Sequence, residues 1–200
     1  MSILRRTTLL AAAAFFVLAP LASAEVLEWE LDGNHSHVGF KVRHLMISWV
    51  RGSFTKAEGK VWFDKDDLST LRMEISIDPS SIDTGMAVRD SDLKGEGFFE
   101  VDKFPEMSFV STGSVPQPDG TVKVAGNLTM HGVTKPVTLE VDGLNAVVQS
   151  DNGPRTGASA TAKVNRREFG LSYNAVVEAG GVVVADDVFI EIDAELKRPR

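Results

Sequence analysis

The four histidines are the side chains in this sequence best suited to metal binding or proton transfer. His35 and His37 are separated by one residue, so both imidazoles would point to the same face of a β-strand, as two metal ligands do. A catalytic zinc site usually has a third protein ligand and a water molecule, and the candidates here are His44 and His131. Neither is placed next to the pair by its spacing. The alternative is that His35 only hydrogen bonds to the Asp32-Gly33-Asn34 turn beside it.

A second concentration of polar groups lies in the stretch Asp83-Thr84-Gly85 and in Arg89 and Asp90. Arg89 could orient the polar end of a bound molecule. Adjacent residues on a helix face in different directions, so Arg89 and Asp90 are not expected to pair with each other. The alternative is a capped helix whose charges only hold it against the rest of the domain.

Several chemical classes have no support in the sequence. It lacks Gly-x-Ser-x-Gly, the phosphate-binding Gly-x-x-x-x-Gly-Lys-Ser/Thr and His-Glu-x-x-His motifs. It has no cysteine, which excludes a disulfide, a thiolate metal site and a cysteine nucleophile. We therefore predict a protein that is not an enzyme, with no catalytic residue, no metal and no cofactor.

The first 24 residues have the pattern of an export signal. Arg5 and Arg6 precede an apolar run over residues 9–18, and Ala22-Ser23-Ala24 supplies the small residues of a cleavage site. The apolar run is shorter than the roughly 20 residues that span a bilayer. We predict a signal peptide over residues 1–24 that is cleaved after Ala24, and a mature domain over residues 25–200 with no integral membrane segment.

The charge of the chain limits its partners. The full sequence has a formal net charge of -7, and loss of Arg5 and Arg6 with no acidic residue makes the mature chain -9. Nucleic acid is not an expected partner, because its phosphates require a basic surface. An anionic membrane should repel the chain as a whole.

Strands must position these side chains, because the mature chain alternates between apolar and polar residues. Leu71, Met73, Ile75 and Ile77 alternate with charged or polar neighbours, and the same pattern recurs along most of the chain. Each such strand has one dry and one wet face, which is typical of antiparallel sheets. Turn signals at short intervals and seven or eight strands indicate a single all-β domain, either a sandwich or an up-and-down barrel.

One helix interrupts the strands. We predict that Thr84 caps a helix that continues to about Lys94 and ends at Gly95, with Val88 and Leu93 turned inward.

The interior of an eight-stranded barrel is either filled by its own side chains or just wide enough for one ligand. Apolar side chains expected inside come from the strands and from the connections: Phe40, Val42, Trp62 or its neighbour Phe63, Phe109, Leu128 and Met130, with Phe98, Phe99 and Phe169. The residue pattern alone favours simple packing of these side chains and leaves a ligand cavity as the alternative.

Longer motifs resemble the YceI-like family over the whole mature chain, in order. They are Trp29-Glu30-Leu31-Asp32 with His35-Ser36-His37-Val38-Gly39-Phe40, Ser81-Ile82-Asp83-Thr84-Gly85 with Arg89-Asp90, Phe98-Phe99, Gly126 to Val137, and Asn165-Arg166-x-x-Phe169-Gly170. The resemblance implies an eight-stranded antiparallel lipocalin-like barrel with an apolar cavity and one or two short helices. It further implies a periplasmic protein that binds a polyisoprenoid, a prenyl quinone or a similar long-chain amphiphile.

By this resemblance, the apolar side chains named above line the cavity. Arg89 and Asp90 lie at its mouth with His35 and His37 close by, as contacts for a polar head group. Two other functions stay open: a metal-dependent enzyme that uses the His35 and His37 pair, and a scavenger of hydrophobic toxic compounds. Trp49 and Val50 could contribute to a homodimer surface.

Overall fold

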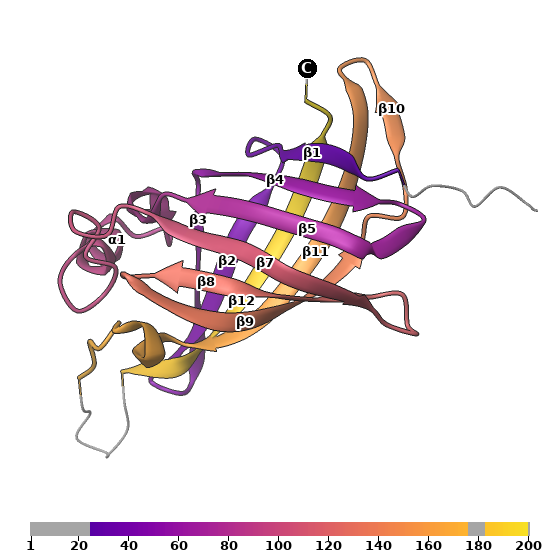
Figure 1. Cartoon of the computed structure of the whole chain (residues 1–200). Helices are drawn as coiled ribbons and strands as arrows, with labels where there is room; N and C mark the ends of the chain where they lie inside the picture. The colour runs from indigo at the N-terminus through magenta and orange to yellow at the C-terminus, as the bar shows by residue number, and fades with distance from the viewer. Residues whose placement is uncertain (1–24, 176–182, 200) are drawn as a thin grey trace, which may run out of the picture.

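The computed structural model describes residues 25–175 and 183–199, and the predicted signal peptide lies outside this part of the chain (Figure 1). Strands dominate it. In chain order they are β1 (Leu27–Leu31), β2 (His37–His44), β3 (Ser48–Phe54), β4 (Ala57–Asp64), β5 (Asp67–Ile77), β6 (Ile82–Asp83), β7 (Met107–Pro116), β8 (Val122–Met130), β9 (Val133–Gly143), β10 (Val148–Ser150), β11 (Gly153–Asn165) and β12 (Val184–Lys197).

These strands close into an eight-stranded antiparallel barrel. β1 and β2 lie end to end along β12, and β3 and β4 lie end to end along β2 and β1, so each pair acts as one interrupted barrel strand. After β4, the barrel strands follow in the order β5, β7, β8, β9, β11 and β12, and each pairs with the strand before it. β12 then closes the barrel against β1 and β2. The predicted barrel is confirmed, and the sandwich alternative is wrong.

The period-two pattern explains which side chains enter the barrel. In β8, Val122, Val124, Leu128 and Met130 are buried, whereas Lys123 and the other odd-numbered residues up to 127 are exposed. Each strand therefore supplies one apolar row to the interior and one polar row to the solvent.

One end of the barrel is filled by its own side chains. Trp29 stacks on Phe63 with ring centroids 5.7 Å apart, and both side chains are almost fully buried. Leu71, Val122 and Val124 are equally buried beside them in the same core. We call these five residues the plug. Because β8 starts at the plug and runs toward α1, the plug lies at the end of the barrel away from this helix (Figure 1).

A single α-helix, α1 (Ala87–Lys94), is present in the described residues, with two short 3-10 helices, η1 (Pro79–Ser81) and η2 (Arg166–Phe169). The predicted end of α1 at Gly95 is confirmed, but the cap residue before the helix is Met86 and not Thr84. Leu93 faces the barrel interior, whereas Val88 is 70% exposed, so its predicted inward position is wrong. Thr84 lies two residues before the cap, and its amide and hydroxyl hydrogen bond to the carboxylate of Asp90.

The strands near the cavity contain a glycine that the packing requires. Gly126 in β8 is buried, and a Cβ atom there would collide with the ring of Phe109 and lie 2.7 Å from the carbonyl oxygen of Val110. Gly126→Ala should therefore destabilise the fold by about 1–3 kcal/mol. Gly113→Ala in β7 is the matched control, because a Cβ atom there meets nothing within 4 Å. Urea unfolding of both variants measures the difference, and equal stabilities would contradict the prediction.

Candidate functional site

The barrel encloses a cavity of about 220 Å³ between the plug and α1. All eight barrel strands contribute apolar side chains to its wall, from Leu31 in β1 to Leu196 in β12. Three alanines, Ala158, Ala160 and Ala194, leave space in β11 and β12 where larger side chains would fill it. Arg166 is the one charged residue in the wall formed by the described residues. Such a cavity can hold an apolar chain and offers almost nothing to a polar one.

Most of the side chains predicted to face the interior do line this cavity: Phe40, Val42, Phe98, Phe99, Phe109, Leu128 and Met130. Trp62 does not, and its predicted position is wrong. Its indole nitrogen donates to the carboxylate of Glu28 at 2.9 Å, while its neighbours Val61 and Phe63 face inward. Alternation allows only one of two adjacent residues to point inside.

Phe169 also differs from the prediction. It is buried in η2, but it packs in the core without lining the cavity. Its carbonyl oxygen lies 3.1 Å from Nδ1 of His131. This contact places His131 in a structural role at the end of β8, with its other ring nitrogen 3.3 Å from Glu100.

A second hollow of about 580 Å³ adjoins the cavity, and we call it the vestibule. Phe40, Val42, Leu93, Phe98 and Val184 line both spaces, so the vestibule is the mouth of the cavity. The rest of its wall combines apolar residues such as Val50 and Val183 with charged or polar ones: Arg43, His44, Arg89, Asp92 and Glu96. The two spaces together have an apolar interior and a mouth that carries charged groups, which matches the two ends of an amphiphile.

Arg89 and Asp90 lie at the mouth end of the barrel, where both are bound to Thr84. Arg89 donates from Nε to Oγ1 of Thr84 and from a terminal nitrogen to its carbonyl oxygen, each at 2.7 Å. Asp90 accepts from the amide and the hydroxyl of the same threonine. Arg89 also lines the vestibule, whereas Asp90 does not. Asp90 therefore holds α1 against the segment that follows β6, and Arg89 is the better placed of the two for a head group.

His35 and His37 lie elsewhere, which corrects their expected position beside the mouth. His37 is the first residue of β2 and His35 lies in the turn before it, whereas His44, which lines the vestibule, is at the other end of β2. A strand rises about 3.3 Å per residue, so roughly 20 Å separate His37 from His44. Val38 and Phe40 line the cavity, so alternation places the ring of His37, which lies beside Gly39, on the outer face of the strand. His35 and His37 therefore lie outside both the cavity and the vestibule.

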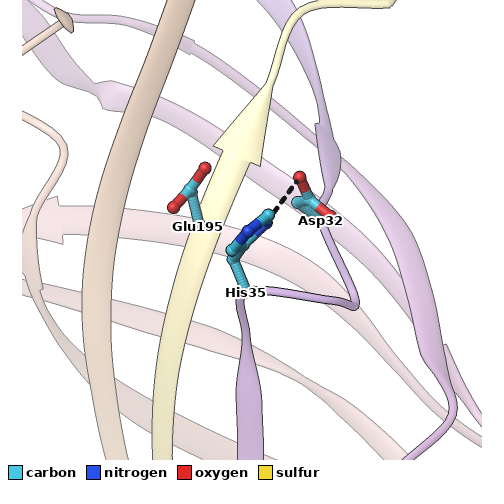
Figure 2. Close-up of side chains that lie close together, drawn as sticks. All are labelled: Asp32, His35 and Glu195. Atoms are coloured by element: carbon cyan, nitrogen blue, oxygen red, sulfur yellow. Dashed lines mark hydrogen bonds and ion pairs between the residues drawn. The ribbon is translucent and has the colours of Figure 1, made fainter.

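His35 faces two carboxylates rather than His37. Figure 2 shows Asp32, His35 and Glu195 close together, and their ligand atoms lie within 4.8 Å of one another. Nδ1 of His35 is 3.2 Å from Oδ2 of Asp32. Nη1 of Arg155 donates to the same Asp32 oxygen and, at 3.0 Å, to Glu195. Arg155 already pairs with both carboxylates, so this group is an ion-pair network, and it does not contain the His35 and His37 pair of the metal-enzyme alternative.

This network predicts how stability depends on pH. Chiefly through its hydrogen bond from Arg155, the pKa of Asp32 is lowered from 3.8 to about 2. Because the pKa of Asp32 is lower in the folded than in the unfolded state, its carboxylate stabilises the folded protein above about pH 4. This stabilisation is lost as the pH falls toward 2. Asp32 is buried, so the contribution is about 2 kcal/mol. Urea unfolding should show that Asp32→Asn is less stable than the wild type at pH 6, with a difference that shrinks toward pH 2. A difference that is constant with pH would contradict this assignment.

Arg166 was not among the predicted site residues, although the motif that contains it is visible in the sequence. It is only 3% exposed. Its guanidinium donates to the carbonyl oxygens of Leu171 at 2.6 Å and Ala185 at 3.0 Å, with longer contacts to Val184 and Asp186. Arg166 thus joins η2 to the start of β12 beside the cavity. The sequence signal that could have identified it is an arginine directly after a strand whose inner face is apolar.

Within residues 25–175 and 183–199, no helix has the length and apolar character needed to cross a bilayer.

Comparisons with known proteins agree with this architecture. The model of the YceI-like domain matches residues 29–196. A UPF0312 protein of Staphylococcus aureus (strain USA300) is 40% identical over 166 residues, which cover 82% of this chain and 94% of that protein. The crystal structure of a Campylobacter jejuni YceI protein is 27% identical, with a TM-score of 0.68 and coverage of 85% of this chain and 97% of that chain.

Two more distant structures share the fold. Burkholderia cenocepacia BcnA is 24% identical with a TM-score of 0.71, and covers 82% of this chain and 98% of its own. A polyisoprenoid binding domain from Saccharophagus degradans, implicated in plant cell wall breakdown, is 17% identical with a TM-score of 0.61, and covers 86% and 98%.

Proposed function

The chain belongs to the YceI-like domain family, and from this premise we propose that it binds a polyisoprenoid or similar long-chain amphiphile inside the barrel. The observation that carries the proposal is the apolar cavity that opens into a vestibule with charged side chains in its wall. The name of the Saccharophagus degradans domain supports the same class of ligand.

The physical argument concerns where binding energy comes from. Each buried CH₂ group contributes roughly 0.8 kcal/mol, so several isoprene units gain more from burial than one polar contact provides. Ordering of the chain and the entropy of association remove much of this gain. Selectivity for the tail should therefore be coarse and set by the length and width of the cavity. The head group would lie in the vestibule, beside Arg89, Asp92 and Glu96.

The proposed role is that of a carrier or sequestering protein in the periplasm, with a prenyl quinone or its precursor as ligand. The support is the predicted signal peptide over residues 1–24. A metal-dependent enzyme is not proposed, because Arg155 occupies the carboxylates beside His35 and because His37 lies apart from them.

Extraction of the purified protein followed by mass spectrometry tests this function. We expect a co-purified long-chain lipid and saturable binding of a prenyl quinone by the lipid-free protein. Failure to find either would contradict the proposal. Competition between a prenyl quinone and a drug-like dye would separate a dedicated lipid carrier from a scavenger: a dye that binds more tightly than the quinone would favour the scavenger.

A further inference from the structure

The turn between β2 and β3 carries exposed apolar side chains. Leu45, Met46 and Ile47 are 38%, 57% and 79% exposed, and they are consecutive. We call these three residues the apolar tip. Single exposed apolar residues are common on soluble proteins, but a contiguous exposed apolar group at the end of a hairpin indicates a binding surface.

The backbone of the apolar tip is unusual for these residue types. The amide of Ile47 donates to the carbonyl oxygen of His44 at 3.1 Å, so Leu45 and Met46 are the two central residues of a tight turn. Both have a positive φ, 50° and 61°. Such turns strongly prefer asparagine and glycine. This hairpin has large apolar side chains where small polar residues would be more stable, which indicates a role for them outside the folded barrel.

Cationic and aromatic side chains lie directly behind the apolar tip, on the outer face of β2 and β3. The guanidinium of Arg43 stacks on Trp49 at 4.1 Å from the ring centroid. Arg51 is exposed two residues further along β3. Neither arginine forms an ion pair with a residue of the described chain. Tryptophan and arginine are the residues that favour the interface between lipid head groups and acyl chains.

The apolar tip also lies at the mouth of the cavity. The residues that flank it in sequence, Arg43, His44 and Val50, line the vestibule. Other exposed apolar side chains lie at the same end: Met86 and Val88 at the start of α1, and Tyr173, which lines the vestibule. A flat surface that covered this rim would contact the apolar tip and the opening of the cavity together.

We propose that the apolar tip docks the protein on an anionic lipid bilayer, with Leu45, Met46 and Ile47 in the interfacial region and Arg43 and Arg51 against lipid phosphates. The docking surface follows from the observations above and does not depend on the proposed function. Its use, the transfer of a lipid between bilayer and cavity, rests on the proposed function. The net charge of -9 of the predicted mature chain opposes association of the chain as a whole, so docking is confined to the edge that carries Arg43 and Arg51.

Vesicle flotation with the mature protein tests the proposal. The vesicles contain equal parts of phosphatidylethanolamine and phosphatidylglycerol, or phosphatidylcholine alone. The wild type should float with the anionic vesicles more than with the neutral ones, and added salt should reduce this difference. The variant Leu45→Asn/Met46→Gly/Ile47→Thr should bind about tenfold more weakly. It suits the turn better, so loss of binding cannot be attributed to unfolding. Arg51→Gln should weaken binding to anionic vesicles by about fivefold.

The matched control is Val115→Thr/Val148→Thr, which removes exposed apolar side chains in β7 and β10. This variant should float like the wild type. The proposal is overturned if the wild type does not float, if the tip variant floats equally well, or if the tip variant turns a wild-type dimer into a monomer in light scattering. Prenyl quinone binding in vesicle-free solution is measured separately: its absence with intact flotation would contradict the proposed function and leave the docking surface standing.

Discussion

Replacement of Ala160 by phenylalanine should weaken lipid binding by about 100-fold while the barrel stays folded. Ala160 lies on β11, opposite Val141 of β9 and Ile192 of β12, and its small side chain faces the cavity. A phenyl ring there would extend into empty space rather than into a packed core. Exclusion of about four CH₂ groups of the ligand costs about 3 kcal/mol, which corresponds to the stated loss. Titration of the lipid-free variant with a prenyl quinone measures it.

The control for this experiment is Thr161→Phe, which adds the same ring one residue later on the same strand. Thr161 is exposed on the outer face, so binding should be unchanged. Thermal unfolding of both variants should give midpoints within a few degrees of the wild type. If Ala160→Phe binds as tightly as the wild type, the cavity is not the lipid site.

The second large effect concerns the fold rather than the ligand. Arg166→Ala should destabilise the protein by about 3–5 kcal/mol, because it leaves the carbonyl oxygens of Leu171 and Ala185 without donors and opens a void beside the cavity. Burial lowers the pKa of this guanidinium, so its hydrogen bonds must compensate for the loss of hydration. The change is measured by urea unfolding at neutral pH.

Arg167→Ala provides the comparison, since the neighbouring side chain is 53% exposed and its ion pair with Asp186 is 3.8 Å long. An exposed pair of this kind contributes little, so the change should stay within about 0.5 kcal/mol. Similar losses in the two variants would show that burial of Arg166 is not what makes it important. Arg166→Met keeps most of the volume, and separates the lost hydrogen bonds from the void.

The dimer surface suggested for Trp49 and Val50 now has a competing explanation. Trp49 packs against Phe189 with ring centroids 5.5 Å apart, and Arg43 stacks on its ring. These two contacts bury part of the apolar surface of Trp49 within one barrel. Val50 lines the vestibule. The homodimer stays a prediction, and light scattering of the wild type and the tip variant tests it together with the docking surface.

The sequence by itself determined the all-β class, the antiparallel strands and most of the cavity wall. Period-two alternation is a local property, and it assigns Phe40, Phe109, Leu128 and Met130 to one face without knowledge of the neighbouring strands. It could not choose between Trp62 and Phe63, because both are aromatic and only the pairing register of β4 turns Trp62 outward to Glu28.

Only the tertiary structure decided what the polar residues do. Arg155 lies far along the chain from Asp32 and His35, yet β11 and β12 bring it to them, and its guanidinium makes an ion-pair network out of a possible metal site. His37 and His44 are on one strand but about 20 Å apart, so only His44 reaches the mouth. Whether a barrel is filled or hollow depends on the summed volume of side chains from all its strands. The large residues of the plug fill one end, and the alanines of β11 and β12 leave space in the wall of the cavity.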